Sequence, residues 1–340
     1  MTIMDTVRLQ AGQLEVTTIR GAEAVAAEGA AIRALADAVP GTPVTSRWPW
    51  IAASIIKPAP GTEPWLVALH SDDELVGAAV LLDDRTGSVR RTTLAGTAEE
   101  HRGGLLALTP EVGAHLGAAV ADALLSELRE FTIGPVPNCP AVSALLSCLP
   151  VGIVIDEVAV PVVHAATGLP VGISHGVART LRKARNRMVA DGVRPEITVT
   201  TDRGEITAML PLLESISRDR DIAAGRVSPL DDPSGRRLWQ RRMIALAGEG
   251  VLQLAALWLN GELAAFVLGV DDGAVYRVLG GRYVARWARY APGRVLEAAV
   301  LDRVVESEQH VLLDWMVDVA SETLIARNGV DPLLVIRGRT

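Results

Sequence analysis

The chain has 340 residues, of which 49% are hydrophobic and 21% are charged, a composition typical of a globular protein with about two domains. Its formal net charge of −7 argues against a nucleic-acid-binding surface that extends over the whole protein. No apolar segment reaches the roughly 18 residues of a membrane span, and the N-terminus lacks a signal-peptide pattern. Cys139 and Cys148 are the only cysteines, so we expect a cytoplasmic protein without a membrane segment or a disulfide framework.

The first part of the chain alternates between helix and strand patterns. Residues 22–39 are rich in Ala and predict a helix. Thr109, Pro110 and Glu111 predict the start of another helix, because Thr is a favoured N-cap, Pro fits the first helical position and Glu complements the positive helix end. Strands are predicted over residues 63–70, 74–82, 88–96, 131–136 and 153–163. The stretch 165–170 predicts a boundary between two domains, 1–165 and 166–340.

The second part begins with a helix after Ser174, whose apolar residues recur at three- and four-residue spacing. Further helices are predicted over residues 204–220, from Ser234 to about residue 247, and from Pro292 to about residue 309. Strands are predicted over residues 195–201, 252–259, 262–270, 274–280, 310–315 and 332–337. The pair Asn260-Gly261 is typical of a tight hairpin turn.

Two hairpin patterns resemble each other, residues 65–82 in the first half and residues 254–269 in the second. Each consists of an apolar strand, a polar turn, a Glu-Leu pair and a strand of small residues. We interpret the similarity as the trace of a duplicated domain.

The helix that starts at Pro292 follows three predicted strands and a Gly-containing loop. The first amides of a helix have no partner within the helix and lie at its positive end, so they favour a pyrophosphate. Gly293 would let a phosphate approach the backbone. The predicted donors are the amides of three residues, and two arginine side chains would add charge: Arg294, Val295 and Leu296, with Arg289 and Arg294.

Several motifs of the second half occur in the order found in a known family. They are the basic helix of residues 180–192, a turn with Arg218, Arg220 and Gly225, the Asn260-Gly261 hairpin, Tyr283 ahead of Ala291-Pro292-Gly293, and Asp314-Trp315 on a strand. In these motifs the chain resembles the FemAB-like (CelD-like) branch of the GNAT acyltransferases. The resemblance covers most of the chain. It implies an α+β fold of tandem GNAT-like domains, each a mixed, mostly antiparallel sheet flanked by helices, with the acyl-donor site in the C-terminal domain alone.

The same resemblance implies an N-acyltransferase of specialised metabolism that uses a coenzyme A thioester and acylates the amine of a small molecule. Fem-like relatives take the acyl group from aminoacyl-tRNA, which makes tRNA an alternative donor and partner. Residues 316–329 depart from the family pattern, because they contain neither its Tyr-Lys pair nor a Tyr that would act as general acid. A non-catalytic ligand-binding protein is therefore a second alternative.

Acyl transfer to an amine needs a proton acceptor and a donor for the developing oxyanion. The backbone at Leu279 and Gly280 is the predicted oxyanion donor. The resemblance singles out Asp314 for proton removal or amine orientation, with Glu297, Asp318 and Glu322 as alternatives. Tyr283 or Tyr290 would protonate the leaving thiolate.

The basic helix supplies candidates for an anionic ligand: the 3′-phosphate of coenzyme A, a carboxylate acceptor or tRNA. The residues assigned to this role are Arg182, Arg185 and Arg220. The six histidines lack the spacing of metal ligands, so no metal is expected.

Overall fold

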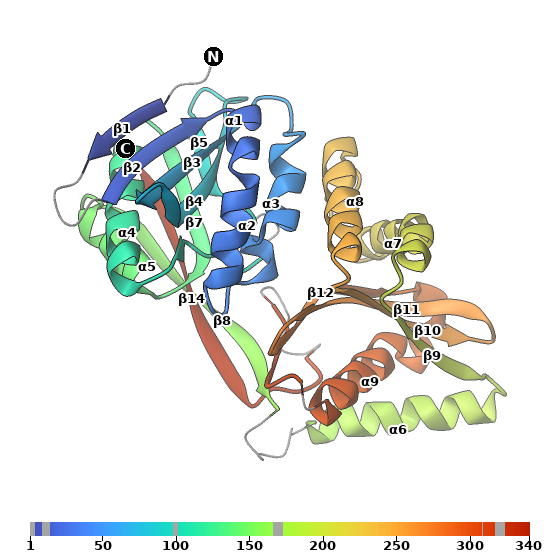
Figure 1. The fold of residues 1–340 in the computed structure, drawn as a ribbon. Helices are drawn as coiled ribbons and strands as arrows, with labels where there is room; N and C mark the ends of the chain where they lie inside the picture. The colour runs from blue at the N-terminus through green and yellow to red at the C-terminus, as the bar shows by residue number, and fades with distance from the viewer. Residues whose placement is uncertain (1–3, 9–13, 98–100, 166–172, 308, 317–323) are drawn as a thin grey trace. The chain divides into compact units, whose positions relative to one another are not determined.

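The computed structural model describes residues 4–8, 14–97, 101–165, 173–307, 309–316 and 324–340. The chain forms two compact units (Figure 1). Unit 1 consists of Met1–Ala159 and Pro332–Thr340, and unit 2 of Val160–Asp331. The sequence placed all of residues 166–340 in the C-terminal domain, whereas the end of the chain belongs to unit 1. This assignment depends on strand pairing between residues far apart in the chain, which no local pattern reveals.

The sheet of unit 1 is antiparallel except at one pair of strands. Its order is β1 (Met4–Arg8), β2 (Leu14–Arg20), β3 (Thr62–Ser71), β4 (Glu74–Asp84), β5 (Arg91–Leu94), β7 (Glu130–Pro137) and β14 (Gly329–Arg339). The short strand β6 (Leu106–Ala107) pairs with β4. The β5–β7 pair is parallel, because a helix crosses over between these strands.

Helices cover both faces of this sheet. One face packs against α4 (Pro110–Leu125) and α5 (Pro140–Cys148), and the other against α1 (Ala22–Ala27), α2 (Gly29–Ala38) and α3 (Trp48–Ile55). The predicted helix over residues 22–39 is thus two helices that meet at Glu28. Thr109 caps α4 as predicted, since its side chain accepts a hydrogen bond from the Val112 amide.

The sheet of unit 2 has a similar plan. Its order is β8 (Val154–His164), β13 (Leu312–Asp314), β12 (Val275–Tyr283), β11 (Glu262–Asp272), β10 (Leu252–Leu259) and β9 (Pro195–Thr200), with only β12–β13 parallel. Helices α6 (His175–Ala190) and α9 (Pro292–Glu306) lie on one face, and α7 (Arg203–Ala223) and α8 (Pro233–Gly248) on the other (Figure 1). The expected α+β fold with mostly antiparallel sheets is confirmed.

Local sequence explains several boundaries in unit 2. Asn260 and Gly261 adopt φ values of 53° and 80°, as a tight hairpin turn between β10 and β11 requires. Ser174 caps α6 as predicted. Helix α8 is capped by Asp232 and not by Ser234, because the Asp232 carboxylate accepts from the Gly235 amide and Pro233 occupies the first helical position. Among the described helices, none combines the length and apolarity that a membrane crossing requires.

Candidate active site

The start of α9 is open to an anion. Its N-cap residue, Ala291, has left-handed backbone angles (φ 46°, ψ 50°) and no side chain that could cap the helix. The first turn contains no acidic residue. The Val295 amide donates to the Ala291 carbonyl at 3.1 Å, so it is already used within the helix. The amides left without a helical acceptor are those of Gly293 and Arg294. The predicted phosphate donors also included the amides of Val295 and Leu296.

Strand β12 provides a second open stretch of backbone. Its pairing with β11 skips Leu279, since Leu268 lies opposite Gly280 and Gly269 opposite Val278. On its other side β12 pairs with β13 only as far as Arg277, among the residues that the structure describes. A Cβ atom added at Gly280 would meet no atom within 4 Å. The bulged half of β12 therefore has unpaired backbone groups beside open space.

Tyr283, the last residue of β12, lies close to the start of α9. A Cβ atom at Gly293 would lie 3.5 Å from Cδ1 of Tyr283, which places the tyrosine ring beside the start of α9. The guanidinium carbon of Arg220, on α7, lies 4.8 Å from the centre of the same ring. Within the described part of the chain, no acidic side chain forms an ion pair with Arg220. The start of α9, a phenol and a cation thus lie next to one another.

Tyr290 and Arg289 both contact Asp191, at the end of α6. The Tyr290 hydroxyl donates to the Asp191 carboxylate at 2.8 Å, and Arg289 forms an ion pair with the same carboxylate at 2.8 Å. The hydrogen bond to Asp191, together with burial, raises the pKa of Tyr290. Both residues therefore connect the segment before α9 to the end of α6.

Asp314 is fully buried in an ion pair. Its carboxylate accepts from Arg277, the neighbouring residue on β12, and from the Met316 amide at 2.8 Å. Arg277 is 2% exposed and also donates to Asp272 at 2.8 Å. A carboxylate with no exposed surface and a buried cationic partner is suited to holding β12 against β13. Arg277 was missed in the sequence, although an arginine inside an apolar strand pattern was a visible signal.

Glu297 lies one helical turn after Gly293. It shares a face of α9 with Val300, Leu301 and Val304, which are buried in the core of unit 2. Removal from water raises the pKa of Glu297 to about 7, an effect that nearby Arg294 opposes. In the described part of the chain, no hydrogen bond or ion pair holds its carboxylate. A half-buried carboxyl that titrates near neutral pH is suited to accept and return a proton.

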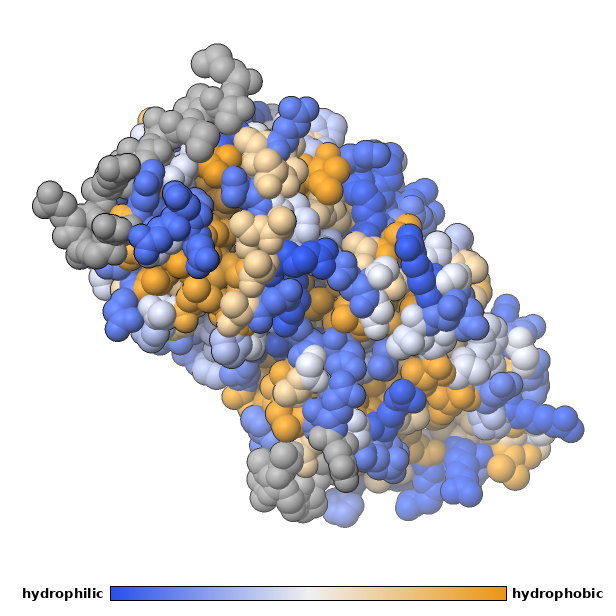
Figure 2. Space-filling view, in the orientation of Figure 1, coloured by the Kyte–Doolittle hydropathy of each residue, from blue (hydrophilic) through white to orange (hydrophobic). Residues whose placement is uncertain are grey.

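The predicted anion-binding arginines do not form one cluster. Arg182 and Arg185 are exposed on α6, whereas Arg220 is on α7, which covers the opposite face of the sheet. Helix α6 carries five basic residues and no acid, and hydrophilic side chains gather along the edge of the unit where α6 lies (Figure 2). Arg294 donates to Thr180 of α6 at 3.4 Å, which connects this helix to the start of α9.

Two alternatives for the proton acceptor, Asp318 and Glu322, lie outside the described residues. Among the described residues, no group of three or more His, Cys, Asp or Glu side chains is arranged to hold a metal ion.

The corresponding helix of unit 1, α4, starts differently. The Thr109 hydroxyl accepts from the Val112 amide at 3.3 Å, so the cap position is filled. Glu111 places a negative charge in the first turn. Both features disfavour a phosphate at this end, since the positive end of the helix is already compensated.

Comparison with known proteins identifies a domain within unit 2. Residues 176–320 match the family model described as an acetyltransferase (GNAT) domain. Unit 2 is a GNAT-type acyltransferase domain. No curated protein sequence matches the chain significantly.

Solved structures resemble the whole chain in fold. FemX superposes with a TM-score of 0.59 and 11% identity, over 92% of this chain and 96% of that chain. L-PGS from Bacillus licheniformis gives a TM-score of 0.57 and 11% identity, over 90% of each chain. A conserved protein of unknown function from Bacteroides thetaiotaomicron gives 0.55 and 12%, over 99% and 100%. The fold of this chain is therefore similar to the folds of FemX and L-PGS.

Proposed function

We propose that unit 2 binds a coenzyme A thioester and transfers its acyl group to the amine of a small molecule. The observation that carries the proposal is the position of Tyr283, which ends the half of β12 that does not pair with β13 and lies beside the uncapped start of α9. A nucleotide donor needs both features, because its pyrophosphate requires unpaired amides and its extended arm requires unpaired strand backbone.

Each part of the donor has a partner in this arrangement. The Gly293 and Arg294 amides bind the pyrophosphate, and Arg220 supplies a positive charge beside Tyr283. The acyl carbonyl lies along the bulge at Leu279 and Gly280, whose amides donate to the oxyanion as the amine attacks.

We assign the proton transfers to two side chains, Glu297 and Tyr283. Nitrogen attack on the thioester carbon forms the C–N bond, and the amine proton passes to the Glu297 carboxylate, directly or through one water. The C–S bond then breaks, and the Tyr283 hydroxyl protonates the departing thiolate. Asp314 acts indirectly, since its ion pair with Arg277 fixes the point at which β12 separates from β13.

Gly293→Asp tests the donor site. A carboxylate in the first turn stabilises the helix but repels a phosphate, so fold and binding should change in opposite directions. We expect at least a tenfold increase in the Kd for acetyl-CoA by titration calorimetry, which corresponds to about 1.4 kcal/mol, with a melting temperature equal to or above that of the wild type.

Gly293→Asn is the matched control, because it adds almost the same volume without the charge. It should bind acetyl-CoA several times more tightly than Gly293→Asp. Equal binding of acetyl-CoA by the wild type and Gly293→Asp would refute the assignment. A panel of primary amines, followed by release of the coenzyme A thiol, then identifies the acceptor.

Helix α6 supports one other donor, an aminoacyl-tRNA. Its exposed Arg179, Arg182, Lys183 and Arg185 have no ion-pair partners among the described residues, as a surface for a phosphate backbone requires. If tRNA is the donor, Arg182→Glu combined with Arg185→Glu should abolish tRNA binding. A milder variant, Arg182→Gln, removes one positive charge. If that charge neutralises one phosphate, the slope of the logarithm of the tRNA association constant against the logarithm of the salt concentration should become shallower by roughly 0.7 to 0.9. If coenzyme A is the donor, these variants should leave tRNA binding undetectable, as in the wild type.

A further inference from the structure

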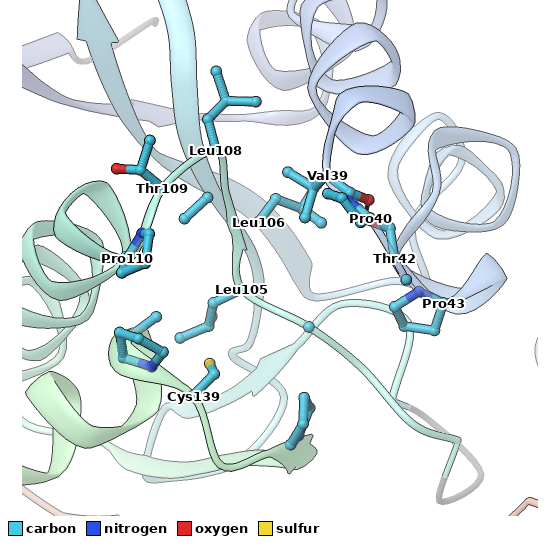
Figure 3. A pocket seen from close by; sticks show the side chains of 17 residues that line it. Val39, Pro40, Thr42, Pro43, Leu105, Leu106, Leu108, Thr109, Pro110 and Cys139 are labelled. Carbon is cyan, nitrogen blue, oxygen red and sulfur yellow. Dashed lines mark hydrogen bonds between the residues drawn. The ribbon is translucent and has the colours of Figure 1, made fainter.

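Unit 1 contains a pocket of about 300 Å³ that the proposed reaction does not use (Figure 3). Three segments enclose it: the loop after α2 at residues 39–43, the extended chain at residues 104–108, and the starts of α4 and α5. All of its lining residues belong to unit 1. Its volume lies at the lower end of the range of small-molecule sites.

The lining of this pocket is uncharged and mostly apolar. Leu105, Leu106 and Leu108 line one stretch of the wall, and Val39 lies beside Leu106 (Figure 3). The remaining rim is rich in proline, with Pro40, Pro43, Pro110, Pro137 and Pro140. Because proline fixes its own backbone angle, such a rim keeps its shape without a ligand. The pocket is therefore preformed for an apolar group.

The start of α4 disfavours an anionic ligand in this pocket. Thr109 already caps the helix, and Glu111 in the first turn would repel a carboxylate or a phosphate. A neutral ligand avoids both effects.

One polar group lies next to the pocket wall. Oγ of Ser46 is 3.5 Å from the position that a Cβ atom of Gly104 would occupy. Ser46 is 2% exposed, and in the described part of the chain its hydroxyl has no hydrogen-bond partner. Ser46 does not line the pocket, and its hydroxyl is buried behind the wall, so the surface that a ligand would meet at Gly104 is backbone.

We infer that this pocket is a binding site for a neutral, mostly apolar small molecule. The site is independent of the donor site proposed in unit 2. Cys139 lines the pocket, whereas Cys148 is exposed at the other end of α5. The reactivity of the Cys139 thiol can therefore report on a ligand in the pocket, and the Cys148 thiol serves as the reference.

The test measures alkylation of each thiol by N-ethylmaleimide in the presence of primary alcohols from butanol to decanol. In Cys148→Ser, an alcohol that fits should slow alkylation of Cys139 at least threefold in a saturable manner. In Cys139→Ser, the rate at Cys148 should not change. Carboxylates of the same chain lengths should protect Cys139 less than the alcohols.

Two substitutions, each made in the Cys148→Ser chain, locate the site. Ala107→Phe fills the pocket and should remove the protection, whereas Ala114→Phe on the exposed side of α4 should not. Equal effects of the alcohols on Cys139 and Cys148, or no protection by any chain length, would overturn the proposal.

Discussion

Replacing Glu297 by Gln is expected to lower kcat for acyl transfer at least 100-fold, because general base catalysis contributes about 10² to 10⁴ in rate. The amide keeps the size of the side chain but cannot accept the amine proton. In the wild type, kcat/KM should rise with pH through about 7, the pKa at which Glu297 becomes ionised. In Glu297→Gln the rise of kcat/KM with pH near 7 should disappear.

The same variant should change stability in a predictable direction. Burial raises the folded-state pKa of Glu297 from 4.5 to about 7. The contribution of the protonated group is therefore fully present below pH 4.5 and is lost as the pH rises through 7, by up to about 3 kcal/mol. Glu297→Gln should accordingly melt at a higher temperature than the wild type at pH 8.5, and close to it only near pH 4.

Glu306→Gln is the matched control, since Glu306 is exposed at the far end of the same helix. It should leave both the pH–rate profile and the melting temperature nearly unchanged. If Glu297→Gln kept full turnover with an unaltered pH profile, the proton acceptor would have to be another group.

Replacing Asp314 by Ala is expected to destabilise the fold by about 3–5 kcal/mol, the range for breaking a buried ion pair. The substitution leaves Arg277, which is 2% exposed, with less of its charge compensated. Arg277→Met should have a comparable effect, and the double variant should be destabilised by less than the sum of the two. Urea unfolding measures all three.

The ion pair between Arg286 and Glu262 is the exposed control for the buried pair of Arg277 and Asp314. Its side chains are 63% and 56% exposed. Glu262→Ala should change stability by less than about 1 kcal/mol. A loss of activity in Asp314→Asn without any loss of stability would contradict the indirect role and support proton removal by Asp314 itself.

Residues that form a site by local geometry were predictable from the sequence. Pro292 and Gly293 marked the start of α9, and the motif order placed Tyr283 ahead of it. Residues whose role depends on a distant partner were not. The hydrogen bond of Tyr290 and the ion pair of Arg289 could not be predicted, because their shared partner Asp191 lies about a hundred residues earlier in the chain. An ion pair between side chains so far apart in the chain leaves no periodic signal.

The sequence by itself determined the kinds of elements, the hairpin at Asn260-Gly261, the capping of α4 and α6, and the resemblance to GNAT acyltransferases. Each of these depends on interactions within a few residues, or on the order of short motifs. Only the tertiary structure decided that the last strand joins unit 1, that Asp314 is buried against Arg277, and that Glu297 faces the core with a pKa near 7. Strand pairing, desolvation and the choice of ion-pair partner depend on the environment that the whole fold creates around a residue.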